Sequence, residues 1–162
     1  MEIRKASKRD IQGFIDCYLD IWRSLQDILP TDYVNDQIEK AYTSTFQNEL
    51  LAEISDPNYI TLVATENGEI IGLAWGNIRK DGSSWLSLLG VSPEHRRKGV
   101  GKSLLTRFIE ESREKGSPKI SFDTDPRLVP AIRLYENMGF VPEGYTKNSY
   151  GLELIIYSKE MI

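Results

Sequence analysis

The sequence predicts an α/β (α+β) fold in which one mixed sheet carries helices on its faces. Segments with helical periodicity alternate with short runs rich in β-branched and aromatic residues, which is the pattern of such a sheet. A chain of 162 residues suits one core that buries about 70% of the extended chain's surface. Hydrophobic residues at 40% and charged residues at 27% are typical of a globular protein. We therefore expect a single domain over residues 1–162.

The N-terminal region predicts a strand followed by an amphipathic helix. The strand is expected at Met1–Lys5, and Ser7 with Asp10 has the spacing of a capping box. Apolar residues then recur at intervals of three and four, so they form one stripe of a helix. That stripe comprises Ile11, Phe14, Ile15, Tyr18, Leu19 and Trp22.

A second helical region is expected from about Thr31 to just before Asp56-Pro57, because the residue preceding a proline disfavours the helical conformation. One face of this region carries Val34, Ile38, Ala41 and Thr45. We expect that face to pack against the core.

The middle of the chain predicts three strands. Tyr59–Ala64 and Ile70–Trp75 flank Asn67-Gly68, a strong signal for a tight β-hairpin. After a turn at Asp81-Gly82, Trp85–Val91 is almost continuously apolar. Continuous apolar character predicts a central strand covered on both faces.

A helix is expected to open at Gly99–Gly101 and to end at Gly116, followed by a strand at Lys119–Thr124. Its inward face is predicted to carry Val100, Leu104, Leu105, Phe108 and Ile109.

Another helix has Pro130 in its first turn and Gly139 as a left-handed cap. Its core face is predicted to carry Ala131, Leu134, Tyr135 and Met138. Phe140–Tyr145 and Leu152–Lys159 then form a closing pair of strands.

Charge and cysteine content exclude several classes of protein. The net charge is −4, so binding of nucleic acid or anionic membrane through the whole surface is not expected, whereas a small cationic substrate suits this balance. Met1–Asp10 is charged and lacks the apolar region of a signal peptide, and no apolar run is long enough to span a bilayer. The lone Cys17 excludes an internal disulfide, so we expect a cytoplasmic protein.

The most informative segment is the basic turn Arg96–Ser103, which joins a buried strand to a helix. Gly99 and Gly101 lack a Cβ atom and permit close approach of a ligand, while the first amides of the helix point outward. Such a helix start binds phosphate. Four cations surround it, at Arg96, Arg97, Lys98 and Lys102. A solvated basic turn is the alternative interpretation.

Two standard phosphate loops do not fit this segment. A P-loop requires glycine where Arg96 stands, and the dinucleotide fingerprint requires a third glycine after Gly101. The segment Arg96-Arg97-Lys98-Gly99-Val100-Gly101 instead resembles the Q/R-x-x-G-x-G/A motif of the GNAT superfamily of N-acyltransferases. Ala131–Phe140 is similar to the A-x-x-L-Y-x-x-x-G-F segment of the same family.

The resemblance implies the GNAT fold: a mostly antiparallel sheet of about six to seven strands, splayed in the middle and flanked by about four helices. It also implies that acetyl-CoA lies in the splay as co-substrate, with its pantetheine arm along Trp85–Val91. The cofactor-binding residues implied are Leu89, Gly90, Val91, Arg96, Arg97, Lys98, Gly99, Val100, Gly101, Lys102, Ser103 and Tyr135.

Two of these residues are expected to be catalytic. The Leu89 amide would stabilise the oxyanion of a tetrahedral intermediate, and the Tyr135 phenol would protonate the departing thiolate. A core role on the apolar face of its helix is the alternative for Tyr135. We expect no metal, because no cluster of ligands has metal-site spacing.

The general base is open. Some relatives use a glutamate where this chain has Trp85, and others use a pair of histidines, whereas His95 is the only histidine here and is expected to be solvated. Asp123 and Asp125 follow a strand near the expected cleft, so either could hold the substrate ammonium or accept its proton. Ordinary turn chemistry at Asp125-Pro126 is the alternative.

Relatives often carry asparagine where this chain has Leu128, so any contact made by that asparagine must be replaced or absent. Cys17 could carry an acetyl group, but a small buried hydrophobe is preferred.

The acceptor site of such relatives is built from the first two helices, the loop between them and the closing hairpin. Those regions carry Trp22, Asp27, Asp32, Tyr33, Tyr145 and Tyr150, of which Trp22 and Tyr33 are the expected substrate residues. Aromatic rings with carboxylates can surround a cation, while simple packing and surface solvation are the alternative.

The leading hypothesis is acetyl transfer to a primary amine of a small molecule. The alternatives are a protein N-terminal or lysine acetyltransferase, which requires an open groove for extended peptide, and a non-catalytic CoA-binding sensor. Relatives of this type frequently form dimers, so a homodimer is a further expectation.

Overall fold

The computed structural model describes residues 1–161, and its centre is a seven-stranded sheet in the order β1-β2-β3-β4-β5-β7-β6. Neighbouring strands are antiparallel, apart from the parallel pair β4 and β5. The strands are β1 Glu2–Lys5, β2 Tyr59–Glu66, β3 Glu69–Ile78, β4 Ser84–Val91, β5 Lys119–Thr124, β6 Val141–Lys147 and β7 Glu153–Glu160. The predicted mixed, mostly antiparallel sheet is confirmed.

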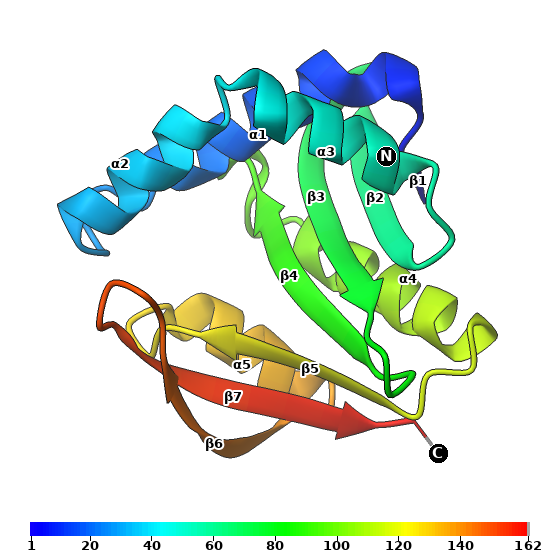
Figure 1. Ribbon diagram of the computed structural model, residues 1–162, viewed down its shortest axis with the longest axis vertical. Coiled ribbons are helices and arrows are strands. Elements are labelled where there is room, and N and C mark those ends of the chain that lie inside the picture. The colour runs from blue at the N-terminus through cyan, green and yellow to red at the C-terminus, as the bar shows by residue number, and fades with distance from the viewer. Residues whose placement is uncertain (162) are drawn as a thin grey trace.

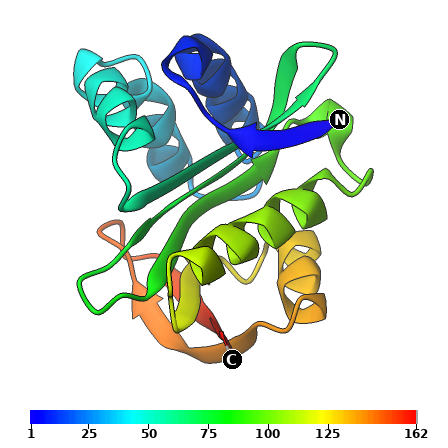
Figure 2. The ribbon, with the colours of Figure 1, turned by 90° about the vertical axis from the view of Figure 1, so that its right-hand side faces the viewer.

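Five α-helices cover the two faces of this sheet. They are α1 Ile11–Arg23, α2 Thr31–Lys40, α3 Ser44–Ile54, α4 Val100–Glu114 and α5 Val129–Asn137, with short 3-10 turns at Lys8–Asp10 and Pro93–His95. Figure 2 shows α1, α2 and α3, in blue to cyan, on the side of the sheet opposite α4 and α5, in yellow-green and orange. No helix in residues 1–161 is long and apolar enough to cross a membrane.

The predicted second helical region is two helices, so the number of helices is five rather than about four. The break falls at Ala41–Thr43, where the Thr43 hydroxyl accepts a hydrogen bond from the Phe46 amide at 3.2 Å and begins α3. The break changes the helical phase. Thr45, which was predicted to share a face with Val34, is therefore exposed, and Phe46 is buried instead.

Other expectations for local structure are confirmed. The β2–β3 hairpin turns at Asn67 and Gly68, whose φ angles are 52° and 79°, as a tight hairpin turn requires. The Asp10 carboxylate accepts a hydrogen bond from the Ser7 amide at 2.7 Å, completing the capping box ahead of α1. The apolar face of α1 is wider than the predicted stripe, because this helix contacts β3, α2 and α3.

Each face of the sheet has its own hydrophobic cluster. One, between the sheet and α4 and α5, includes Phe108, Phe122 and Tyr135. The other lies under α1 and α3 and includes Phe14 and Leu50. The sheet therefore has helices packed on both faces.

The sheet opens between β4 and β5. These strands pair only at Ser84 with Ile120 and at Trp85 with Ser121, and they diverge beyond Trp85 (Figure 1). The predicted coverage of β4 on both faces is therefore wrong for its second half, since Leu88–Val91 is only half-buried. In this half of β4, the apolar residues line the opening between β4 and β5 instead of filling a core.

Candidate active site

A cleft of about 570 Å³ occupies the region where β4 and β5 diverge. Its walls come from the end of β4, the turn before α4, the α1–α2 segment and α5. Of the residues predicted to bind cofactor, it is lined by Leu89, Gly90, Val91, Arg96, Arg97, Gly99, Val100, Gly101, Lys102 and Tyr135. Lys98 and Ser103 lie beside it in the chain without lining it. The structure thus gathers most of the predicted set around one space.

The turn before α4 has the backbone of an anion site. Arg97 and Gly99 both have left-handed conformations, with φ angles of 64° and 81°. Helix α4 begins at Val100 with no side-chain cap, so its first amides are left for a ligand. The Ser103 amide is already bonded to the Gly99 carbonyl at 3.0 Å, which places the available amides ahead of it.

The charges of this turn support the same conclusion. Within residues 1–161, no carboxylate forms an ion pair with any of its four cations, Arg96, Arg97, Lys98 and Lys102. Four neighbouring positive charges repel one another, and a multiply charged anion relieves that repulsion. The turn suits a pyrophosphate.

The Arg96 side chain forms hydrogen bonds with two other elements of the chain. Its Nε donates to the Val91 carbonyl at 3.0 Å, and its Nη2 donates to the Ser24 hydroxyl at 2.8 Å. Partial burial lowers the pKa of this guanidinium. Arg96 therefore joins β4 to the end of α1.

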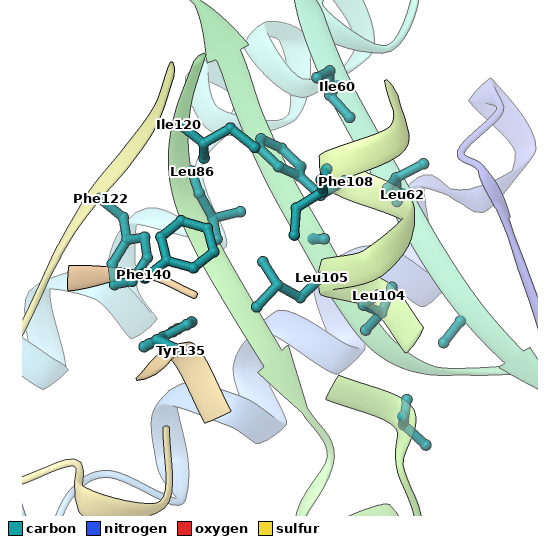
Figure 3. Close-up of a cluster of buried hydrophobic side chains, with 14 of the residues drawn as sticks. Ile60, Leu62, Leu86, Leu104, Leu105, Phe108, Ile120, Phe122, Tyr135 and Phe140 are labelled. Carbon is teal, nitrogen blue, oxygen red and sulfur yellow. The ribbon is translucent and has the colours of Figure 1, made fainter. Parts of the chain in front are cut away.

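Tyr135 lies at the boundary between the cleft and the core. It is 6% exposed, lines the cleft and packs against Phe122, with the ring centroids 4.1 Å apart. Figure 3 shows Tyr135 at the edge of the cluster that contains Phe122 and Phe140. Burial raises the pKa of its phenol, so the hydroxyl stays protonated at neutral pH and can act only as a proton donor there.

The two predicted aspartates differ in their surroundings. Asp125 is 4% exposed, and the Arg127 side chain donates to it twice, from Nε at 2.9 Å and Nη2 at 2.7 Å, so this pair stabilises the turn before α5. That bond holds the pKa of Asp125 below its ordinary value. Asp123 is exposed and has no such partner in residues 1–161, and partial desolvation raises the pKa of its carboxyl.

The aromatic residues predicted on the acceptor side form a continuous row. Trp22 contacts Tyr33 edge-on at 5.3 Å between centroids, and Tyr33 contacts Tyr150 at 5.0 Å. The Tyr150 hydroxyl donates to Asp36 Oδ2 at 2.6 Å. Burial, with a smaller contribution from the charge of Asp123, raises the pKa of Tyr33.

The other candidates of that group do not join the row. Tyr145 is 82% exposed, and Asp27 and Asp32 are also exposed to solvent.

Comparison with known proteins gives the family of this chain. Residues 22–140 match the model of the Acetyltransferase (GNAT) family. The chain belongs to the GNAT family. It is an N-acetyltransferase, an enzyme of the acyltransferase class.

A curated relative is the ribosomal protein bS18-alanine N-acetyltransferase of Escherichia coli K12, 25% identical over 122 residues, or 75% of this chain and 80% of the relative. Among solved structures, PaiA N-acetyltransferase of Thermoplasma acidophilum in complex with coenzyme A has a TM-score of 0.84 at 24% identity, covering 99% and 98% of the two chains. Ribosomal-protein-alanine N-acetyltransferase of Brucella melitensis has a TM-score of 0.80 at 23% identity, covering 99% and 100%. At such identities these structures show the shared GNAT fold.

The positions where this GNAT chain departs from the motif of its relatives can now be located. Leu128, which replaces an asparagine, lies on the cleft wall as an apolar residue. Trp85, which replaces a glutamate, carries the Arg79 guanidinium 4.0 Å above its ring. A cation stacked on an aromatic ring therefore lies where some relatives have a base.

The side chains of His95 and Cys17 are both largely shielded from solvent. The expectation that His95 is a solvated loop residue is wrong: its side chain is 21% exposed, lines the cleft and has Nδ1 3.5 Å from Glu66 Oε2. Cys17 is 2% exposed with Sγ 3.5 Å from Ser92 Oγ, and burial raises the pKa of the thiol to about 11. No cluster of three or more potential metal ligands occurs in residues 1–161.

Sequence reasoning missed Ser24 and Asp36. Their partners, Arg96 and Tyr150, are 72 and 114 residues away in the chain. Neither a serine at a helix end nor an aspartate on an exposed helical face carries a local signal for such a partner.

Proposed function

We propose that this GNAT enzyme transfers an acetyl group from acetyl-CoA to a primary amine of a small molecule, by direct attack in a ternary complex. The cleft at the splay would take acetyl-CoA, with the pyrophosphate at the turn Arg96–Lys102 and the pantetheine along Leu89–Val91. Three features of this chain support the binding of acetyl-CoA there. The first amides of α4 are free, the cations of the turn have no carboxylate partners in the described residues, and the apolar end of β4 lines the same cleft.

The observation that favours a small acceptor is the bond between Tyr150 and Asp36. It joins the turn between β6 and β7 to α2, and the tilted contact between the Tyr150 and Tyr33 rings reinforces the connection. Figure 1 shows these two elements approaching each other across the open side of the sheet. An extended peptide needs an open groove between them, whereas a small amine does not.

Three residues would carry the chemistry. The Leu89 amide would stabilise the oxyanion, and Tyr135, whose phenol stays protonated, would give its proton to the thiolate. Asp123 would hold the substrate ammonium and accept its proton through water, since no arginine in residues 1–161 donates a hydrogen bond to its carboxyl and desolvation raises its pKa despite the opposing charge of Arg79. Asp125 is less suited to this role because Arg127 occupies both of its oxygens.

A protein acceptor is the second candidate, because the E. coli relative is named for acetylating the alanine of a ribosomal protein. An acetyl-CoA consumption assay can separate the two candidates. The panel should contain spermidine, free amino acids, an aminoglycoside and a peptide with a free N-terminal alanine. We expect turnover with one or more of the small amines and none with the peptide.

The bond between Tyr150 and Asp36 is tested in the same assay. Tyr150→Phe keeps the ring but removes the hydroxyl, so we expect the ratio of peptide to small-amine activity to rise. Tyr145→Phe is the matched control, because Tyr145 is 82% exposed and outside the aromatic row. Faster turnover of the peptide than of every small amine by the unmodified protein would overturn the proposal. Acetyl-CoA binding without transfer to any acceptor would favour the sensor.

A further inference from the structure

A chain of three hydrogen bonds connects the end of β4 to the end of α1. Arg96 donates from Nε to the Val91 carbonyl at 3.0 Å and from Nη2 to the Ser24 hydroxyl at 2.8 Å. The Ser24 hydroxyl in turn donates to the Ile21 carbonyl at 2.6 Å. The two bonds of the Ser24 hydroxyl are compatible, because the hydroxyl accepts one hydrogen bond and donates the other.

Ser24 lies between α1 and a segment that lines the cleft. It follows the last residue of α1 and precedes a segment whose Leu25 and Ile28 line the cleft. Beyond this segment, α2 carries Tyr33 and Asp36 of the acceptor side. A shift of Ser24 would therefore move one wall of the cofactor cleft. It would also move α2, the helix that borders the acceptor side.

Helix α1 also lies directly on β4 at this point. A Cβ atom added to Gly90 would come within 2.7 Å of Ile21 Cδ1, so the strand and the helix are in close contact beside the expected thioester position. A small displacement of α1 here would change the shape of the cleft next to Leu89 and Gly90.

Arg96 has no carboxylate partner in residues 1–161, and both of its bonds go to neutral oxygens of different elements. A side chain that served only as a phosphate ligand would leave its donors directed at the anion. Here two donors are already committed to holding α1 against β4. A planar guanidinium suits this task because its donors diverge at fixed angles.

We infer that Arg96 is a positioning residue: through Ser24 it fixes the α1–α2 segment against the end of β4 and so sets the approach of the acceptor amine to the thioester. This role rests on the proposed function, because it concerns the acceptor of that reaction. A misplacement of about 1 Å between reacting groups can reduce a rate by about 100-fold. The bond to Ser24 therefore affects amine transfer more than it affects CoA binding.

Ser24→Ala tests the inference without replacing any residue of the anion-binding turn. Three quantities are measured on the full chain: the Kd for CoA by calorimetry, kcat and KM for n-butylamine as probe, and amide hydrogen exchange of residues 25–29. We expect a Kd within about twofold, a kcat/KM for the amine lowered about tenfold, and faster exchange in residues 25–29. Ser24→Thr, which keeps a hydroxyl, is expected to restore all three.

Thr106→Ala is the matched control. The Thr106 hydroxyl also donates to a carbonyl of its own helix, that of Lys102 at 2.8 Å, but it has no arginine partner in the described structure. We expect this variant to behave as the unmodified protein in all three measurements.

Two results would overturn the inference: unchanged exchange in Ser24→Ala, or a loss of CoA affinity by the same factor as kcat/KM. If the unmodified protein does not acetylate n-butylamine, that failure concerns the proposed function. Hydrogen exchange and calorimetry of Ser24→Ala then test the inference. Faster exchange in the segment after α1, at unchanged CoA affinity, supports the positioning role, and any other combination of results rejects it.

Discussion

The rings of Phe122 and Tyr135 lie with their centroids 4.1 Å apart at an interplanar angle of 45°. Phe122 is 2% exposed and also contacts Tyr157 of the neighbouring strand β7, with the centroids 5.8 Å apart. The phenol that borders the cleft is thus fixed by a fully packed ring of β5. A proton donor held by packing loses little conformational freedom when the substrate binds.

Replacement of Tyr135 by phenylalanine is expected to lower kcat about 100-fold, since general acid catalysis typically contributes that much or more. The Kd for CoA should stay within about twofold, because the ring and its packing are kept. Steady-state kinetics and calorimetry measure the two quantities. Tyr157→Phe removes a hydroxyl from the same cluster away from the cleft and should be active. An unchanged kcat in Tyr135→Phe would exclude this residue from the mechanism.

Replacement of Gly99 by alanine is expected to destabilise the protein and weaken CoA binding. A left-handed alanine costs about 1 kcal/mol, and the turn that holds the anion would shift. Gly116→Ala is a matched control, because Gly116 also has a positive φ and no atom within 4 Å of an added Cβ, but does not line the cleft. Urea unfolding should show similar losses for both variants, whereas calorimetry should show a Kd about fivefold higher for Gly99→Ala alone. Equal CoA affinity in the two variants would contradict the anion site.

Asp10 predicts a specific dependence of stability on pH. The Arg4 guanidinium, which donates to Asp10 at 2.7 Å and 2.8 Å, holds the pKa of this carboxyl well below its usual range. A carboxyl whose pKa is lowered by folding stabilises the protein fully above its unfolded value of about 3.9, and this contribution is lost as the pH falls towards the folded value.

Asp10→Asn should therefore cost about 2 kcal/mol at neutral pH, with a smaller difference from the unmodified protein below about pH 4. Urea unfolding at several pH values measures this. The exposed Asp16 on α1 gives a control, and Asp16→Asn should cost less than about 0.5 kcal/mol. A difference between Asp10→Asn and the unmodified protein that does not shrink in acid would exclude the ion pair as the cause.

Cys17 is expected to be unreactive and dispensable for acetyl transfer. Burial raises the pKa of its thiol to about 11, and the residue lies outside the lining of the cleft. Alkylation by iodoacetamide at mildly alkaline pH should be more than about tenfold slower in the folded protein than in urea, because the thiolate is the reactive form. Cys17→Ala should retain kcat within about twofold. An acetylated cysteine detected by mass spectrometry after incubation with acetyl-CoA would instead indicate a covalent route.

Local sequence patterns predicted most elements of the fold. Asn67-Gly68 encodes its hairpin because both residues tolerate positive φ, and Pro130 and Gly139 bracket α5 as expected. The division between α2 and α3 was missed, because Thr43 acts as a cap only once the chain has turned after Ala41. The predicted cover on both faces of β4 failed for a similar reason, since apolar residues line a binding cleft as readily as a core.

The sequence by itself determined the order of the strands, the basic turn at Arg96–Ser103 and the two motifs that indicate the family, since each depends on residues close together in the chain. Only the tertiary structure decided that Arg127 binds Asp125, that Arg96 reaches Ser24 and that Tyr150 bonds to Asp36. Periodicity and turn chemistry report the local conformation of the backbone. A hydrogen bond between α2 and the β6–β7 turn depends on how the two hydrophobic clusters pack these elements around the sheet, and no local pattern records that.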